Sequence, residues 1–452
     1  MTKTLIETDV LIIGAGFSGL RAADLLRGKC DFVLLEARDR VGGRAMAHTF
    51  ENGDTVDVGG QWVGPGQDRL YALIRELGRD IYPLWDEGDR LLNSRGKLSR
   101  YRGTIPGLPP HVLLSVHMMM ERFDRMAAEI DPAKPWTHPR AMEWDRMTVA
   151  EWMRQQSWSR RARDVFAVGI GAVFAAEPHD VSLLHALFYA RAGSSLDNLV
   201  STTGGAQQDR VHGDMAGIAA ALADRVSDQL KLDEPVRQVA WADEGVVVDT
   251  PKARYKARRM IQALPPNQAM RIRFDPVLPA DRAGLWLRMP PGSCIKCVAQ
   301  YATPFWRDTG LAGQAVGPEL EVRVTFDNTE AGKASGQLLG FIEGDHARKW
   351  SARPAEERRA AVLDAFAAYY GEAARHPVDY VDQDWTAEQY SRGCYAALMG
   401  PGVWTTYGHR LREPLGPIHM AGTETATSYY GYFEGALEAA ERAVAEVLEA
   451  LD

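Results

Sequence analysis

Three glycines and a glutamate near the N-terminus have the spacing of a dinucleotide-binding motif. Gly14, Gly16 and Gly19 form the pattern G-x-G-x-x-G, and Glu36 follows about 20 residues later. Gly14 permits a tight turn, Gly16 lets the backbone approach a pyrophosphate, and Gly19 permits close packing of a helix. Glu36 is placed to accept hydrogen bonds from ribose hydroxyls. The spacing alone does not distinguish NAD from FAD.

A lysine inside an apolar run is the next candidate for chemistry. Lys296 lies in the run Ser293–Cys297, where a buried ammonium is costly unless it is paired or catalytic. Cys294 and Cys297 have C-x-x-C spacing, but on a strand they point to opposite faces, and no second pair completes a metal site. The pattern therefore predicts no metal, and a lysine that either reaches solvent or takes part in catalysis.

Hydrophobic periodicity predicts the elements that position these residues. Asp9–Ile13 and Phe32–Leu35 are typical of buried strands, and Leu20–Arg27 between them is typical of a helix. This βαβ opening indicates a doubly wound parallel sheet.

Later segments suggest a partly helical region and then a return to sheet. The breaker Ile105–Pro110 precedes a helical tract, His111–Ile130, and the helical pattern continues to about Ala192. Asp214–Val226 is typical of an amphipathic helix. Strand-like runs follow at Val236–Ala240, Val246–Val248, Arg259–Ala263, Ile295–Tyr301, Leu320–Phe326 and Leu338–Ile342.

Composition indicates a large globular protein. The 452 residues are 46% apolar and 25% charged, and the net charge of −8 argues against a general binder of nucleic acid or anionic membranes. Four cysteines are too few for a disulfide scaffold, and Met1–Asp9 lacks the apolar core of a signal peptide. Phe166–Ala176 is shorter than the roughly 20 apolar residues of a membrane span. We therefore expect a cytoplasmic protein without a membrane anchor.

The sequence beyond Glu36 resembles the flavin-containing monoamine oxidase family. Glu36–Arg44 and Asp57–Pro65 are similar to the family's extended FAD fingerprint, in which Arg44 adds a phosphate contact. Gly416–Thr427 and Gly431–Ala436 resemble its second flavin-binding region. Asp233–Val236 and Asp384–Trp385 match segments beside the adenine and the flavin. The resemblance implies FAD binding by Gly14, Gly16, Gly19, Glu36, Arg44, Val236, Trp385, Cys394, Glu424 and Thr425.

The resemblance also implies catalytic roles. Tyr390–Tyr395 is similar to the segment where monoamine oxidases attach FAD through a cysteine, here Cys394, and place the first of two cage tyrosines, here Tyr395. Tyr432 falls on the second tyrosine, and Lys296 on the lysine that holds a water at flavin N5. Arg392 stands where the family has a glycine, so noncovalent FAD is the alternative.

Matching segments also place a substrate cavity. Ser201–Gln207 resembles the junction where a glutamine lines that cavity. Alignment of Glu177–Ser182 and of Thr325–Thr329 with the family places small side chains at further positions of the cavity wall. These are expected to favour apolar, bulky monoamines over diamines, because they provide no charge partner for a second ammonium. The expected cavity residues are Ala172, Val173, Val200, Gln207 and Val324.

The implied fold is a two-domain α/β FAD-dependent amine oxidase fold. A Rossmann-like FAD-binding domain is expected from residues 1–79, 208–286 and 388–452, and a substrate domain of mixed sheet and helices from residues 80–207 and 287–387. The implied activity is oxidation of an amine to an imine, and then an aldehyde or ketone, with O2 forming hydrogen peroxide. The expected partners are a small amine, O2 and a second copy in a homodimer.

Three alternatives remain open at this stage. The first is a dehydrogenase that passes electrons to an acceptor other than O2. The second is an L-amino-acid oxidase, disfavoured because Gln61-Trp62-Val63 lacks the arginine that would bind a carboxylate. The third is a non-catalytic binding protein with this fold, which would be expected to lose the lysine and the tyrosines.

Overall fold

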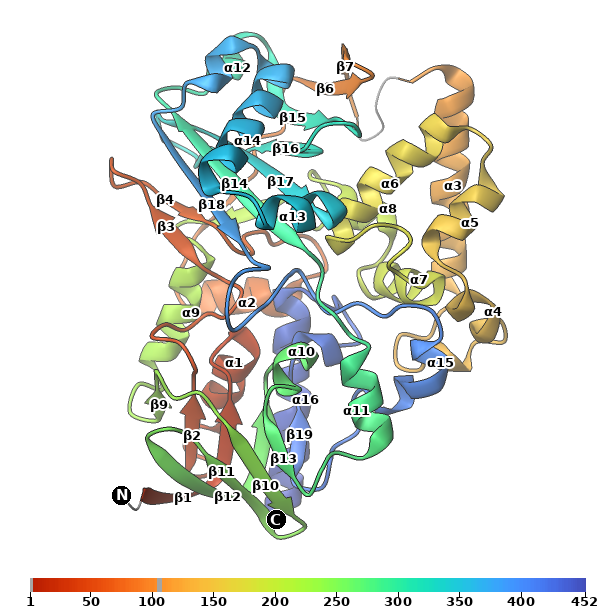
Figure 1. Cartoon of the computed structure of the whole chain (residues 1–452). Coiled ribbons are helices and arrows are strands. Elements are labelled where there is room, and N and C mark those ends of the chain that lie inside the picture. Colours follow the sequence, from red (N-terminus) through yellow and green to blue (C-terminus); the bar gives the residue numbers. More distant parts are fainter. Residues whose placement is uncertain (1–2, 104–107) are drawn as a thin grey trace.

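The computed structural model describes residues 3–103 and 108–452. Residues 105–107, the first half of the predicted breaker Ile105–Pro110, therefore lie outside the described residues. Figure 1 shows a lower sheet with its helices, an upper sheet with its helices, and a further group of helices to the right of the upper sheet.

The lower sheet has eight strands. They are β1 (Thr4–Ile13), β2 (Phe32–Leu35), β9 (Leu230–Lys231), β10 (Gln238–Ala242), β11 (Gly245–Asp249), β12 (Ala253–Gln262), β13 (Arg273–Asp275) and β19 (Ile418–Met420). Their order is β13-β10-β11-β12-β1-β2-β9, with β19 beside β12. β1 pairs in parallel with β2 and with β12, and β12 pairs in parallel with β19. The predicted parallel βαβ opening is therefore confirmed.

The two faces of β1 bury different cores because successive side chains point to opposite sides. Val10 and Ile12 pack in one core with helices α1 (Phe17–Leu26), α2 (Asp68–Glu76), α9 (Met215–Asp224) and α16 (Phe433–Leu451). Leu11 and Ile13 pack in the other core. Helix α1 begins three residues before the predicted start, because Gly16 has an extended backbone and serves as its N-cap.

The upper sheet has seven strands, antiparallel except for one pair. They are β6 (Asp89–Ser94), β7 (Lys97–Tyr101), β14 (Cys294–Tyr301), β15 (Leu311–Val316), β16 (Val324–Asp327), β17 (Gly336–Glu343) and β18 (Asp379–Asp384), in the order β18-β14-β17-β16-β15-β6-β7. The predicted strand Leu320–Phe326 is shortened to β16, because Gly317 and Leu320 close a turn before it.

Two helices and two small ribbons complete the sheet regions. Helices α13 (Gly344–Ser351) and α14 (Ala355–Tyr370) accompany the upper sheet in Figure 1. The ribbons pair β3 (Ala47–Thr49) with β4 (Thr55–Asp57), and β5 (Ile81–Pro83) with β8 (Asp209–Val211). Connecting helices are α10 (Pro266–Ala269), α11 (Ala280–Leu287), α12 (Phe305–Asp308) and α15 (Val403–Tyr407).

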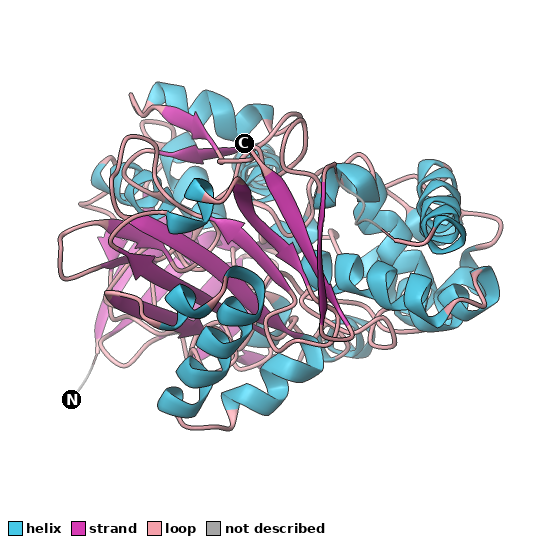
Figure 2. Cartoon of the chain, turned by 90° about the horizontal axis from the view of Figure 1, so that it is seen from above, coloured by secondary structure: helices cyan, strands magenta, loops and turns pink. Residues whose placement is uncertain are grey.

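The third part of the molecule is helical. It comprises α3 (Pro110–Ala128), α4 (Ala141–Arg146), α5 (Val149–Gln156), α6 (Arg160–Phe174), α7 (Leu183–Ala192) and α8 (Leu196–Val200). Phe123, Trp152 and Phe166 join α3, α5 and α6 through aromatic contacts. Figure 2 shows this group to one side of the strands. The predicted helical tract His111–Ile130 is confirmed as α3.

Both sheets collect strands from distant parts of the chain. The lower sheet uses residues 4–35, 230–275 and 418–420, and the upper sheet uses residues 89–101, 294–343 and 379–384. The domain boundaries given above stay a prediction. Among the helices of the described ranges, none is both long enough and apolar enough to cross a membrane.

Candidate active site

A cavity of about 360 Å³ brings together residues of both sheets and of the helical group. Its wall includes Ile13 and Leu35 from the ends of β1 and β2, Phe341 from β17, and Tyr189 from α7. The residues singled out from the sequence that line it are Gly14, Gly16, Glu36, Arg44, Ala172, Val173, Gln207, Val236, Lys296, Trp385, Cys394, Tyr395 and Tyr432.

Five other residues singled out from the sequence are not part of the cavity wall. Gly19 packs inside the motif, where a Cβ would stand 1.8 Å from the carbonyl oxygen of Gly14. Val324 shares a sheet face with Phe326, but only Phe326 reaches the cavity. Val200, at the end of α8, packs against the core that contains the helices of the helical group. The remaining two, Glu424 and Thr425, support the site from behind, as described below.

The carboxylate of Glu36 stabilises the glycine-rich turn by accepting hydrogen bonds from the backbone. Its Oε2 accepts a hydrogen bond from the N–H of Ala15 over 2.8 Å, and its Oε1 accepts one from the N–H of Arg38 over 3.0 Å. Gly14 has a φ of +97°, which favours glycine. At Gly16 an added Cβ would meet only the Cα of Gly43, at 3.9 Å. The backbone therefore leaves a cradle at Gly16 that suits a bulky anionic group at a helix N-terminus.

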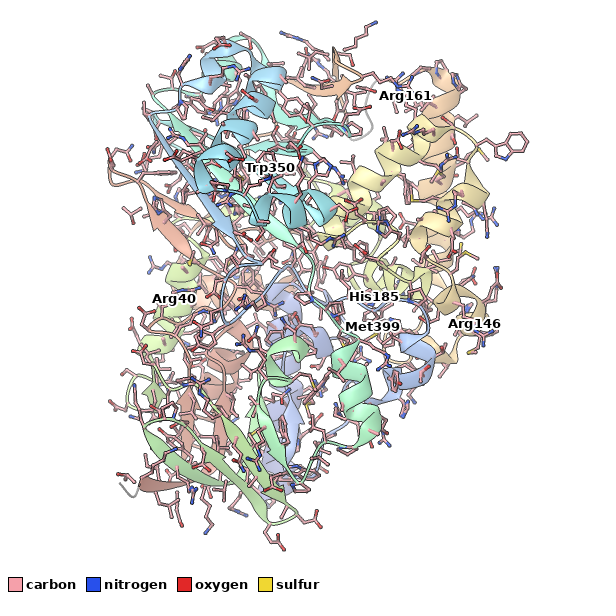
Figure 3. All side chains as sticks on the ribbon, in the orientation of Figure 1. Arg40, Arg146, Arg161, His185, Trp350 and Met399 are labelled. Atoms are coloured by element: carbon pink, nitrogen blue, oxygen red, sulfur yellow. The ribbon has the colours of Figure 1, made fainter. Side chains whose placement is uncertain are left out.

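Hydrogen bonds from an arginine side chain fix the conformation of the loop after Glu36. Arg40, labelled in Figure 3, donates hydrogen bonds to the carbonyls of Gly43 and Ala45 at 3.2 Å. Gly43 has a φ of +59° and stands beside Gly16. The second glycine pair of the sequence therefore forms the opposite side of the cradle.

Arg44 lines the cavity and also makes an internal ion pair. Its Nη1 and Nη2 donate to the two carboxylate oxygens of Glu424, at 2.7 and 3.3 Å, and Nη1 also donates to the carbonyl of Tyr395. Burial lowers the pKa of the guanidinium, but Glu424 more than restores it, so the net pKa is raised. Thr425 accepts a hydrogen bond from Arg442. The N-terminal and C-terminal motifs are thereby joined beneath the cavity.

Lys296 is buried, with 2% of its surface exposed, and lies on β14 with its Nζ at the cavity. Nζ donates to the carbonyl of Gly59 over 2.8 Å and to Oε1 of Gln61 over 2.5 Å. Burial lowers the pKa of this ammonium, and the charge of Asp57 opposes that shift. A neutral amine would use both N–H groups on these acceptors and leave its lone pair for the cavity, whereas an ammonium would leave an N–H.

A chain of amides fixes the orientation of Gln61. Its Nε2 donates to Oδ1 of Asn328 over 2.8 Å, and Nδ2 of Asn328 donates to Oε1 of Gln337 over 3.2 Å. Oε1 of Gln61 must therefore face Lys296. Sequence reasoning missed the direct role of Gln61 and the buried charge of Asp57. Their positions could have indicated a role, since both polar residues flank the glycine pair of the Asp57–Pro65 segment.

Cys394 and the two tyrosines line the same cavity as Lys296. Cys394 is buried, and its N–H donates to the carbonyl of Gly292 over 3.0 Å. Arg392 has a φ of +59°, so it adopts the backbone of the glycine it replaces and the turn is preserved. Its side chain is exposed. Trp385 donates its indole N–H to the carbonyl of Val58 over 2.9 Å.

Comparisons with known proteins identify the relatives of this chain. The model of a family described as flavin containing amine oxidoreductase matches residues 17–448. The chain belongs to the flavin-containing amine oxidase family. AofH of Mycobacterium tuberculosis is 40% identical over 97% of this chain and 96% of that protein. Amine oxidase [flavin-containing] B of Homo sapiens is 38% identical over 98% of this chain and 87% of that protein.

A solved structure gives the same result for the fold. Wild-type putrescine oxidase bound to putrescine superposes with a TM-score of 0.93 at 34% identity, covering 98% of this chain and 100% of the other. The predicted α/β amine oxidase fold and flavin-dependent amine oxidation are therefore confirmed. FAD is the cofactor of this flavoprotein family, and the open cradle at Gly16 fits it.

Proposed function

We propose that this flavoenzyme oxidises apolar, bulky monoamines to imines and uses O2 as its electron acceptor, forming hydrogen peroxide. The observation that carries the proposal is that one cavity joins the dinucleotide motif to Lys296, Tyr395 and Tyr432. FAD, when bound, supplies a two-electron acceptor for the amine carbon. Side chains of this protein would bind the cofactor, hold a water and orient the amine.

These side chains divide into holding and reacting groups. Gly14, Gly16, Glu36 and Val236 would hold the dinucleotide, and Lys296 would hold a water beside the reacting atoms. Tyr395 and Tyr432 would orient the amine through the negative faces of their rings. Gln207 adds an acceptor, since its buried Oε1 makes no hydrogen bond within the described residues and the residue lines the cavity.

Anaerobic bleaching of the flavin absorption by a panel of amines tests this proposal. Bleaching by monoamines, followed by peroxide formation when air is admitted, would support it. Bleaching without peroxide on re-aeration would favour the dehydrogenase alternative, and bleaching only by α-amino acids would favour an amino-acid oxidase. If no member of the panel bleached the flavin, the non-catalytic alternative would be favoured.

We expect a preference for arylalkylamines over diamines. Within the described residues, the carboxylates that line the cavity are Glu36 and Glu234, both beside the adenine segment, so a second ammonium near the tyrosines finds no partner. Because an unpaired buried ammonium is costly, kcat/KM for 2-phenylethylamine should exceed that for putrescine about tenfold or more. Steady-state peroxide assays with both amines measure this, and a clear preference for putrescine would refute the assignment.

We expect a thioether between Cys394 and the flavin, since the thiol is buried in the cavity wall beside the segment of Trp385. Acid precipitation of the purified protein should leave the flavin on the polypeptide, with a flavin-sized increase in mass. The increase should vanish in Cys394→Ala and persist in Cys297→Ala, whose thiol packs in a different core. A yellow supernatant and an unmodified polypeptide mass would rule out the bond.

Three further expectations stay predictions. They are a cytoplasmic location, a homodimer, and O2 as the physiological acceptor. Fractionation of cells, light scattering of the purified protein and oxygen-consumption rates test them in turn.

A further inference from the structure

A buried carboxyl lies behind one of the two cavity tyrosines. Glu343 is the last residue of β17, has 2% of its surface exposed, and stands opposite Cys294 of β14. In the same ladder Phe341 stands opposite Lys296, and Cys294, Lys296 and Phe341 all line the cavity. Glu343 therefore shares the cavity face of the upper sheet without lining the cavity itself.

The phenol of Tyr395 contacts this carboxyl. Its hydroxyl donates to Oε1 of Glu343 over 2.8 Å, and Sγ of Cys294 lies 3.9 Å from the same phenol oxygen. Tyr432 differs, because its hydrogen bonds in the described part of the chain run through its backbone. The two tyrosines of the cavity are therefore unequal, since only Tyr395 is linked to an ionisable group.

Few other groups compensate the negative charge of Glu343. Its Oε2 is buried and makes no hydrogen bond among the described residues. Arg323, the cation that acts on it, is paired with Glu177 at 3.1 Å. Burial raises the pKa of Glu343 to about 7, with the hydrogen bond from Tyr395 and the charge of Arg323 opposing the shift and Glu177 adding to it. The carboxylate therefore forms as the pH rises through about 7, facing the phenol.

We infer that Glu343 is a positioning residue that acts through Tyr395, holding the ring at the cavity wall and strengthening the negative face that the ring presents to the nitrogen of an amine. A hydrogen bond to an ionised acceptor is stronger than a neutral one and moves electron density onto the phenol. Attraction of a cation to a tyrosine ring grows with that density. The inference rests on the proposed function for the role of Tyr395, but its test does not require turnover.

Two probes of equal shape separate charge from size in this test. Choline carries a permanent charge and no nitrogen lone pair, and 3,3-dimethylbutan-1-ol is its neutral counterpart. Binding of each to the FAD-loaded protein is followed by the change in flavin absorption. We expect Glu343→Gln to lower the preference for choline over the alcohol by roughly three- to tenfold. In the wild type this preference should grow between pH 6 and pH 8 by more than it grows in Glu343→Gln, because Glu343 ionises only in the wild type, whereas Lys296, whose pKa is lowered to about 7, loses its charge in both proteins.

Matched variants decide whether the effect passes through the phenol. In a Tyr395→Phe background, Glu343→Gln should produce no further loss, whereas an equal loss there would show direct attraction between the carboxylate and the probe and overturn the inference. Glu177→Gln, which alters the same charge cluster without contacting Tyr395, should keep the preference within about twofold of wild type. An equal loss in Glu177→Gln would also overturn the inference.

A second comparison keeps the inference testable if Glu343→Gln does not fold. Tyr395→Phe removes the hydroxyl that contacts Glu343, whereas Tyr432→Phe removes a hydroxyl that has no such contact. We expect the preference for choline to change less with pH in Tyr395→Phe than in Tyr432→Phe, because only the first variant loses the part that depends on Glu343. Equal pH profiles for the two variants would contradict a role for Glu343.

Discussion

Lys296→Met is expected to slow amine oxidation by about 10²- to 10³-fold while FAD remains bound. The substitution removes the buried Nζ that lies between Gly59 and Gln61 and faces the cavity. Either protonation state of Nζ leaves one site for a water or substrate proton, which a methionine cannot provide. The motif at Gly14 and Gly16 is left intact, so cofactor binding should persist.

Stopped-flow measurement of both half-reactions, together with the ratio of flavin to protein, checks this expectation. Lys333→Met is a matched control, since Lys333 is a half-exposed lysine that pairs with Asp54 at 2.9 Å. It should leave both rates within about twofold of wild type. Unchanged reduction and reoxidation rates in Lys296→Met would remove Lys296 from the reaction.

Gly16→Ala and Gly19→Ala are expected to weaken FAD binding for different reasons. Gly16 has an ordinary φ of −76° and open space, so its methyl group costs the apoprotein little but enters the cradle for the pyrophosphate. Overpacking of about 1–3 kcal/mol there would weaken FAD binding roughly 10- to 100-fold. Gly19→Ala forces a methyl group to within 1.8 Å of the carbonyl oxygen of Gly14, so it should also destabilise the apoprotein.

Both variants are best made in a Cys394→Ala background, where no thioether can retain the flavin. Fluorescence titration gives the Kd for FAD, and thermal melting of the apoprotein gives its stability. Gly217→Ala on α9 is a control, because its added methyl group would lie 3.5 Å from Asp214, an ordinary contact away from the cavity. An unaltered Kd in Gly16→Ala would contradict pyrophosphate binding at this position.

The sequence predicts best where local patterns decide the structure. Phe32–Leu35 forms the predicted strand because four apolar residues lie between polar ones, and α3 follows its apolar stripe. Val236 illustrates a limit, because it precedes β10 instead of opening it and lines the cavity. Periodicity cannot distinguish an apolar residue that pairs in a sheet from one that faces a ligand.

Side-chain contacts between distant segments could not be predicted from the sequence. The pairing of Arg44 with Glu424 spans 380 residues, and no local pattern indicates that the expected phosphate ligand is also part of an internal ion pair. Glu343 ends a run that is otherwise apolar, which marks it as unusual, but its contact with Tyr395 depends on packing between the upper sheet and a later loop. Resemblance located Val324 on the correct strand, yet Phe326 is the residue of that strand that reaches the cavity.

The scattered origin of the lower sheet has a consequence for biosynthesis. β1 ends at Ile13, but its parallel neighbour β12 begins only at Ala253, so at about 5–20 residues per second the ribosome takes roughly 10–50 s to supply it. Trp385, Cys394 and Tyr432 emerge later still, and each lines the cavity. The nascent chain therefore carries an apolar strand with one unpaired edge for much of its synthesis, and the complete flavin site forms only after these late segments have been made.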